Sequence, residues 1–256
     1  MSIIRTSIES LSSIFVSLKK FCFVSSVSSV EILSSLSLTF LFSLLALYQN
    51  TQRNSINIMT QLRQLARNEH SLIGDIIANS FADDPVALWL FGGPIGIKHY
   101  ISKVAQKLYL KQGFGVVVDT AKNSSGGALW LPPGVKKKVP LINSIDIALP
   151  MIKHSGLWSI PRGIKVDNAL CHVKPMTPHY FLFAIGTRPS QQGKGVGGRL
   201  MEAGLKKVDA ARMPAYLESS KESNIPFYRS YGFEVMERFV PTTNCPPLWL
   251  MWRAPQ

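Results

Sequence analysis

Apolar side chains in residues 72–111 recur at the spacing of helices. Ile73, Ile76 and Ile77 repeat with the period of an amphipathic helix. Pro85 suits the first turn of the helix that follows. The pattern predicts helices over residues 72–81, with a start as early as Gln61 left open, over 86–91 and over 100–111.

The period then changes to that of β-strands. Residues 113–119 and 128–131 are typical of two strands, and residues 123–127 between them are typical of a hairpin turn. Residues 179–187 form a nearly continuous apolar run, which indicates a strand buried on both faces. Between the hairpin and this strand we expect a helix over residues 141–154 and an irregular segment over 155–175.

The C-terminal part alternates between helical and β periods. Leu200, Met201, Leu205 and Val208 form the apolar stripe of one predicted helix. Helices come first, then a hairpin, then alternating strands and helices, which predicts a mixed domain of the α/β or α+β class. The predicted elements here are a helix over 195–211, a strand over 214–219, a short helix over 224–231, and strands over 232–240 and 248–253.

Residues 1–58 differ in composition from the rest of the chain, because they are rich in serine and apolar side chains. Residues 32–48 are mostly apolar, but serines interrupt the roughly 20 apolar residues that a membrane span needs. Three interpretations stay open: a membrane anchor, an organellar targeting segment, and a segment upstream of a working start at Met59. We expect residues 59–256 to form one domain.

The chain carries a formal net charge of +13 over 256 residues, and residues 1–58 contribute little of it. A basic surface attracts polyanions such as nucleic acid and phosphorylated cofactors. The sequence has no zinc-finger spacing and no aromatic run of the RNA-recognition type. We therefore expect neither a nucleic-acid partner nor a metal site.

The three cysteines, Cys22, Cys171 and Cys245, are an odd number and lie far apart in the sequence. They form no CxxC motif and no disulfide framework, which indicates a reducing compartment. We expect buried, unreactive thiols at Cys171 and Cys245 and a cytoplasmic protein. A membrane-anchored location through residues 32–48 is the alternative, and the oligomeric state stays open.

A glycine-rich loop over residues 191–198 follows a predicted strand and opens a predicted helix. A helix N-terminus attracts anions, and glycines let a phosphate approach the backbone. The Walker pattern fails because Lys194 precedes a glycine. A dinucleotide pattern fits Gly193, Gly195 and Gly198, but this loop stands several residues off its strand and little chain follows it. A purely structural glycine turn is a further alternative.

Within this loop Gln192, Gly195 and Gly197 fill the pattern (Q/R)-x-x-G-x-(G/A). The pattern resembles the pyrophosphate loop of the GNAT acyltransferase superfamily. The preceding strand also resembles that family's central strand, with Thr187 where valine is usual. The likeness covers roughly Met59 to the end. Residues 81–85, 216–220, 224–233 and 248–253 are similar to the puromycin N-acetyltransferase-like branch.

The resemblance implies a mixed α/β fold with a central, mostly antiparallel sheet that splays at a cofactor wedge and is flanked by helices. It implies an acetyl-CoA-dependent N-acetyltransferase that acts on the primary amine of a small molecule by direct attack in a ternary complex. Acetyl-CoA is then the co-substrate. A non-catalytic CoA-binding module of the same fold and a membrane-tethered interaction protein are the alternatives.

The resemblance also implies where acetyl-CoA binds. Its pantetheine arm is expected to pair with the strand that ends at Thr187, and its pyrophosphate is expected on the backbone amides of the glycine loop. Arg188 and Lys194 could add charge there or face solvent. The expected cofactor-binding residues are Ala184, Ile185, Gly186, Thr187, Gln192, Gly193, Lys194, Gly195, Val196, Gly197, Gly198 and Asn224.

Two residues are candidates for the chemistry. The resemblance makes Tyr228 the acid that protonates the leaving thiolate, and core packing is its alternative. Glu218, at the end of a predicted strand, is the candidate base, and holding a backbone group is its alternative. Asp83 and Asp84 could line the acceptor pocket, or Asp84 could cap a helix. His172 and His179 are possible proton relays.

Overall fold

The structure, a computed structural model, describes residues 60–120, 123–135 and 145–256. Several predictions of the sequence therefore fall outside the described residues: the apolar run over 32–48, the start at Met59 and the domain boundary that it implies. Within the described ranges no helix has both the length and the apolar character needed to cross a membrane.

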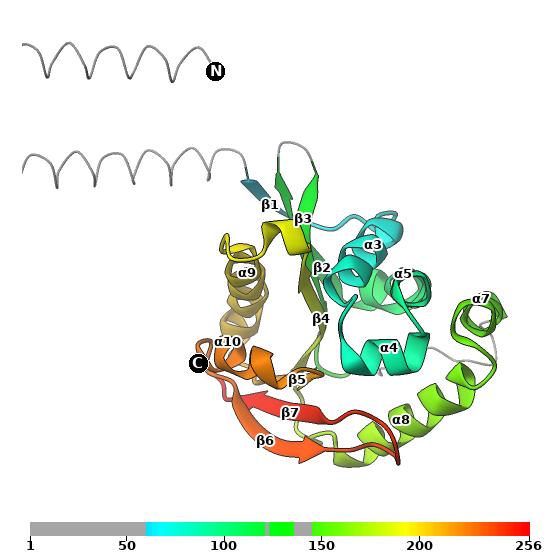
Figure 1. Ribbon diagram of the computed structural model, residues 1–256. Helices are drawn as coiled ribbons and strands as arrows, with labels where there is room; N and C mark the ends of the chain where they lie inside the picture. The colour runs from blue at the N-terminus through cyan, green and yellow to red at the C-terminus, as the bar shows by residue number, and fades with distance from the viewer. Residues whose placement is uncertain (1–59, 121–122, 136–144) are drawn as a thin grey trace, which may run out of the picture. The chain divides into compact units, whose positions relative to one another are not determined.

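The described strands form one seven-stranded sheet in the order β1-β2-β3-β4-β5-β7-β6 (Figure 1). Only the β4–β5 pair is parallel, and every other neighbouring pair is antiparallel. The strands are β1 (Thr60–Gln64), β2 (Phe114–Thr120), β3 (Ser124–Leu131), β4 (Tyr180–Thr187), β5 (Ala215–Ser219), β6 (Glu234–Phe239) and β7 (Leu248–Arg253).

Helices cover both faces of this sheet (Figure 1). One face carries α9 (Val196–Ala210) and α10 (Ile225–Arg229), and the predicted apolar stripe of α9 is buried there. The opposite face carries the remaining helices: α3 (His70–Ser80), α4 (Pro85–Phe91), α5 (Pro94–Val104), the π-helix η1 (Ala105–Tyr109), α6 (Leu110–Gln112), α7 (Ile145–Ser155) and α8 (Ser159–Val173).

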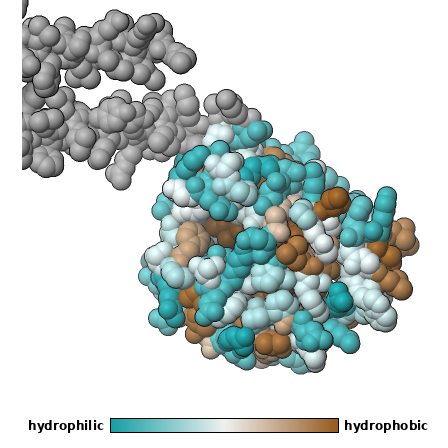
Figure 2. All heavy atoms as spheres, viewed as in Figure 1, coloured by the Kyte–Doolittle hydropathy of each residue, from teal (hydrophilic) through white to brown (hydrophobic). Residues whose placement is uncertain are grey.

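The predicted fold class, a mixed domain with a mostly antiparallel sheet between helices, is confirmed. Two short helical segments of 3-10 type, η3 (Pro189–Gln191) and η4 (Glu222–Asn224), precede α9 and α10. Apolar side chains stay exposed around α7, where Figure 2 shows one of several brown areas. They include Ile145, Leu149, Leu157 and Trp158.

One open alternative and one predicted element are wrong in type. Residues 60–64 form strand β1, not the start of a helix, because they pair with β2 and Arg63 forms ion pairs with Asp119 and Glu69. Such pairing with a distant strand overrides local helical spacing. Residues 159–173 form helix α8, not an irregular segment. Val166 and Leu170 supply its buried face, whereas Gly163 within it hid the pattern.

Two further details differ from the predictions. Gly126 and Gly127 lie inside β3 and not in the hairpin turn. A Cβ at Gly127 would come within 2.4 Å of the Ile73 side chain, so glycine lets α3 pack closely on the sheet. The Cys245 thiol is buried, as expected, but Cys171 is exposed on the outer side of α8, so the prediction of a buried thiol there is wrong.

The sheet opens at β4 and β5, which positions the site described next. The two strands pair only from Tyr180 to Leu182 on β4, and the rest of β4 has only β3 as its hydrogen-bonded neighbour. The β3–β4 register skips Phe183 at a β-bulge, and bulges bend a strand. The bulge therefore falls where β4 leaves β5, and the sheet is splayed as the sequence resemblance implied.

Candidate functional site

The glycine loop leads from the end of β4 into α9. Gly193 and Gly195 have φ angles of 73° and 76°, a left-handed conformation that favours glycine. Gly195 is the N-cap of α9, and the next residue, Val196, is buried and anchors the helix. A side chain added at Gly193 or Gly195 would meet no atom within 4 Å. Open space therefore lies over the N-terminus of α9, where backbone N–H groups attract anions.

A cavity of about 530 Å³ lies at this loop and reaches to α10. Most of its wall comes from the end of β4, the loop and η4. Two other residues of the wall, Ser80 and Phe81, lie at the end of α3. The predicted cofactor-binding residues that line it are Ile185, Gly186, Thr187, Gln192, Gly193, Gly195, Val196, Gly197, Gly198 and Asn224.

Two cations of this region point to other partners. Lys194 is not in the wall, because its Nζ donates to the carbonyl oxygen of Ser190 at 2.8 Å. The Arg188 guanidinium donates to the Asp75 carboxylate at 2.6 Å and to a backbone oxygen of β3. Both side chains hold the loop and the strand end in place. The one basic side chain in the described wall is Lys221, which forms an ion pair with Asp83. Backbone N–H groups and Lys221 are therefore what the described wall offers to an anion.

Helix α3 closes one side of this cavity. The Ser80 hydroxyl donates to the carbonyl oxygen of Thr187 at 2.9 Å. A Cβ at Gly186 would come within 2.7 Å of Ser80, so only glycine lets α3 approach β4 this closely. The predictions did not include Ser80, and its position became visible only with the tertiary packing.

A smaller cavity of about 50 Å³ fills the gap between the separating ends of β4 and β5. Asn224 and Tyr228 line both this gap and the larger cavity. Burial, and to a lesser extent the charge of Asp84, raises the pKa of the Tyr228 phenol well above its usual value. Tyr228 therefore keeps its proton at neutral pH, as a proton donor must.

Asp84 holds the chain together beside this gap. Its Oδ1 accepts a hydrogen bond from the backbone N–H of Ala87 at 2.8 Å and caps α4, as one of the sequence interpretations expected. Its Oδ2 accepts a hydrogen bond from the Ser220 hydroxyl. Its neighbour Asp83 is exposed and forms an ion pair with Lys221 at 2.6 Å. Asp84 is thus a buried bridge between α4 and the end of β5.

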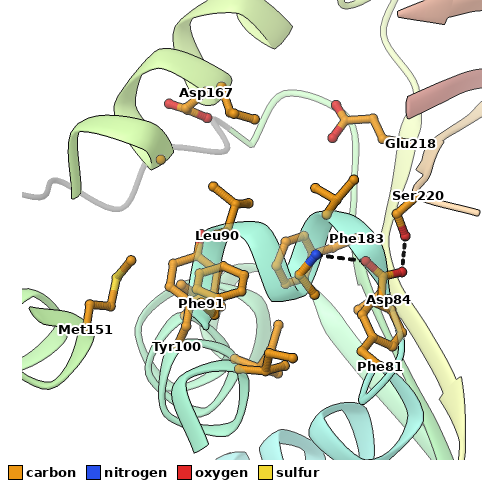
Figure 3. A pocket seen from close by; sticks show the side chains of 18 of the residues that line it. Phe81, Asp84, Leu90, Phe91, Tyr100, Met151, Asp167, Phe183, Glu218 and Ser220 are labelled. Carbon is orange, nitrogen blue, oxygen red and sulfur yellow. Dashed lines mark hydrogen bonds between the residues drawn. The ribbon is translucent and has the colours of Figure 1, made fainter. Parts of the chain in front are cut away.

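A third cavity, of about 240 Å³, lies on the side of the gap that faces α4, α5, α7 and α8. Its wall is mainly apolar and aromatic (Figure 3). Glu218 and Ser220 line both this cavity and the gap, as do Phe183 and Ala184. The three cavities therefore adjoin one another through shared residues, with the gap between β4 and β5 in the middle.

The two histidines lie away from the walls of these three cavities. Nδ1 of His179 lies 2.6 Å from the carbonyl oxygen of Thr177, and its ring packs edge-on against Tyr216 and Trp252. Burial lowers the pKa of His179. His172 is exposed and pairs with a carbonyl oxygen of its own helix. Both histidines have structural partners, so the geometry gives no support to a proton relay through them.

Sequence reasoning did not find several residues of the third cavity, among them Tyr100, Tyr109 and Asp167. The periodicity placed Tyr100 and Tyr109 on a predicted helix but gave no sign that either residue lines a cavity. Asp167 lies on α8, which the pattern did not predict. The residues of this wall that the sequence did single out are Asp84, Glu218 and Ala184, together with Phe81 of the segment 81–85.

Comparison with known proteins agrees with this geometry. Residues 163–235 match a family model described as an acetyltransferase (GNAT) domain. A protein of Schizosaccharomyces pombe described as an uncharacterized N-acetyltransferase is 25% identical over 208 residues, which cover 70% of this chain and 77% of that protein.

Solved structures share the fold at low identity. A structure described as histone acetyltransferase HPA2 and related acetyltransferase, from Corynebacterium glutamicum, is 21% identical, with a TM-score of 0.59 over 77% of this chain and 97% of that one. A polyamine N-acetyltransferase of Drosophila melanogaster, which forms N-acetylagmatine, is 12% identical, with a TM-score of 0.50 over 75% and 97% of the two chains.

Some of these comparisons support the predicted fold, and others support the predicted activity. The solved structures support the fold alone. The family model and the yeast relative both describe an acetyltransferase, which confirms the prediction of an acyltransferase with acetyl-CoA as co-substrate and does not favour a non-catalytic module. The family match over residues 163–235 and the splayed sheet together support a GNAT acetyltransferase domain in this chain.

Proposed function

We propose that this chain transfers an acetyl group from acetyl-CoA to the primary amine of a small molecule, by direct attack in a ternary complex. The observation that carries the proposal is the adjacency of the three cavities at the splay of β4 and β5. One cavity has the chemistry for a phosphorylated carrier and another has the chemistry for an apolar acceptor. The gap between them brings the two substrates within reach of each other.

The cavity at the glycine loop suits acetyl-CoA. The pyrophosphate would lie on the N–H groups at the start of α9, over the open space at Gly193 and Gly195. The pantetheine arm would follow the unpaired side of β4 from Thr187 back to Ala184, toward the gap. Asn224, in the wall of both cavities, would hydrogen-bond the arm or the adenosine side.

The reaction couples one acyl transfer to a series of proton transfers. The ammonium group of the acceptor gives a proton to Glu218, directly or through water, and the resulting amine attacks the thioester carbon. A backbone N–H near Ile185 would stabilise the oxyanion. The C–S bond then breaks, and Tyr228 gives its proton to the sulfur. The acetylated nitrogen still carries one proton too many and gives it to Tyr228, which restores the phenol. Glu218 releases the proton that it accepted, so one proton leaves to solvent per turnover.

The experiment is an initial-rate study of thiol release by the full chain, with acetyl-CoA and a panel of primary amines. We expect release that depends on the amine and a family of intersecting double-reciprocal lines, which is the signature of a ternary complex. Parallel lines would contradict direct attack. Binding of acetyl-CoA without thiol release for any amine would indicate a non-catalytic module.

The finer expectations from the sequence stay predictions. They are the likeness to the puromycin N-acetyltransferase-like branch, the cytoplasmic location, and the roles of Tyr228, Glu218 and the cofactor-binding residues. What supports the site roles is position, because Tyr228 and Glu218 both line the gap between the two larger cavities.

A further inference from the structure

The third cavity has a chemistry of its own. Aromatic rings form part of its wall: Tyr100 stacks on Phe91 with ring centroids 4.6 Å apart, and Tyr109 stacks on Phe183 at 4.2 Å. The rest of the described wall is mostly aliphatic, with Ile147 and other side chains of α4, α5, α7 and α8. Its volume of about 240 Å³ lies just below the roughly 300–1,000 Å³ of sites for drug-sized ligands. The cavity therefore suits a small, largely apolar molecule.

The charges of this wall are all negative. Asp84, Asp167 and Glu218 are the ionisable acids among the described residues that line it, and no lysine, arginine or histidine is among them. Asp84 is engaged as a helix cap and with Ser220. In a chain of net charge +13, this cavity is a local exception.

Asp167 and Glu218 come from different elements but line the same cavity. Figure 3 shows Asp167 on α8 and Glu218 on β5 at the same side of the pocket, opposite the aromatic rings of Phe91 and Tyr100. Burial, followed by the charges of Asp167 and Glu218, raises the pKa of Tyr100 to about 12. The pKa of Tyr109 is raised by burial and by the same two carboxylates among its neighbours.

Two carboxylates beside an apolar cavity select for a particular ligand. A single ammonium group gains from both charges. A second charge at the other end of the ligand would have to enter the apolar part of the cavity without a partner, and the desolvation of that charge costs free energy. A carboxylate on the ligand would meet Asp167 and Glu218 as like charges. Aromatic walls add favourable contact with a ring or an alkyl chain.

We propose that the acceptor is a primary monoamine with an apolar body, either an aryl ring on a short linker or an alkyl chain. Its ammonium group lies between Asp167 and Glu218, and its apolar body lies against Tyr100, Phe91 and Phe183. Asp167 is then a specificity-determining residue for the acceptor. The inference rests on the proposed acetyl transfer and names the substrate class of that site.

The test compares ligands of one length that differ in their charges. Hexylamine carries one ammonium group, 1,6-diaminohexane carries two, and 6-aminohexanoate adds a carboxylate; 2-phenylethylamine tests the aromatic body. With the full chain we expect kcat/KM for hexylamine and 2-phenylethylamine to exceed that for the diamine and the aminohexanoate by about 10-fold or more. Equal or higher values for either doubly charged ligand would overturn the inference.

The variant for this test is Asp167→Asn, and Glu234→Gln, an exposed carboxylate on the edge strand β6, is its matched control. Asp167→Asn should raise the KM for hexylamine about 10-fold and leave the KM for acetyl-CoA unchanged. The control should match the wild type for both substrates. An unchanged KM for hexylamine in Asp167→Asn, with acetyl-CoA binding intact, would overturn the inference.

Binding measured without turnover separates this inference from the proposed function. Hexylamine is titrated calorimetrically into the protein saturated with CoA, and acetyl-CoA is titrated into the free protein. If acetyl-CoA fails to bind, the proposed function fails and the inference falls with it. If acetyl-CoA binds but hexylamine and 2-phenylethylamine neither bind nor react, the inference is overturned and the proposed function stands for other amines.

Discussion

The hydroxyl of Ser220 donates a hydrogen bond to the buried carboxylate of Asp84, a residue 136 positions earlier in the chain. The bond joins the N-cap of α4 to the end of β5, and both residues line the apolar cavity. One buried carboxylate therefore ties the start of α4, in the wall of the third cavity, to the end of β5 beside the gap.

Loss of this bridge should destabilise the protein. Asp84→Ala removes both the helix cap and the acceptor for Ser220, so we expect a loss of about 1–2 kcal/mol in the free energy of unfolding, measured by urea titration. Asp83→Ala is the matched control, because Asp83 is 81% exposed and its ion pair with Lys221 lies at the surface. Its effect should be within about 0.5 kcal/mol. Equal losses in the two variants would contradict the bridge.

Tyr228 is expected to act in the chemical step and not in binding. Tyr228→Phe should lower kcat by about 10²- to 10⁴-fold and leave the dissociation constant for acetyl-CoA unchanged. Tyr231→Phe is the control from the same region, because Tyr231 lies outside the described walls of the three cavities. A full wild-type rate in Tyr228→Phe across the pH range would remove the residue as the acid.

Gly204 shows how tightly α9 packs on the sheet. A Cβ at Gly204 would come within 2.4 Å of the ring of Trp130, which is fully buried. Gly204→Ala should cost about 1–3 kcal/mol through overpacking, despite the gain of about 1 kcal/mol from helix propensity. Thermal unfolding should therefore show a lower Tm. An unchanged or higher Tm would show that the helix moves away from the ring at no cost.

Protonation of Asp75 should contribute to a loss of unfolding free energy at acidic pH. Hydrogen bonds from Lys98 and then Arg188 hold the pKa of Asp75 below its usual value. A lowered folded-state pKa stabilises the protein above the unfolded-state pKa near 3.9, and this stability is lost as the pH falls through the folded-state value. The difference in unfolding free energy between wild type and Asp75→Asn should therefore be largest near pH 7 and shrink toward pH 2. A difference that is constant with pH would contradict this role.

The strongest periodic patterns of the sequence predicted elements correctly. The apolar run over 179–187 is β4, and the stripe of α9 is buried as expected. The glycine loop between them was predictable as an anion site, because positive φ angles at Gly193 and Gly195 and a helix start are local properties. Local chemistry thus pointed to the loop where the structure has an open cavity, and the binding of acetyl-CoA there stays a prediction.

The third cavity, which we propose binds the acceptor, could not be predicted in the same way. Its walls come from helices distant in sequence, and Asp167 and Glu218 line one cavity only after α8 packs beside α4. The sequence left a helix start near Gln61 open and gave no sign of strand β1, because its partner β2 lies more than fifty positions away. The bulge at Phe183, which marks the splay, depends on pairing with β3 and leaves no signal in the apolar run.

The most direct test of the account is a calorimetric titration of the full chain with acetyl-CoA, in wild type and in Gly197→Val, with NADH as a control ligand. A Cβ at Gly197 would make only ordinary contacts of 3.6 Å or more, so the variant should fold, while its added methyl groups enter the cofactor cavity. We predict that the wild type binds acetyl-CoA and not NADH, and that the variant binds at least about 10-fold more weakly, a loss of about 1.4 kcal/mol. A folded wild type that does not bind acetyl-CoA, or a variant that binds it equally well, would contradict the placement of the cofactor at this loop.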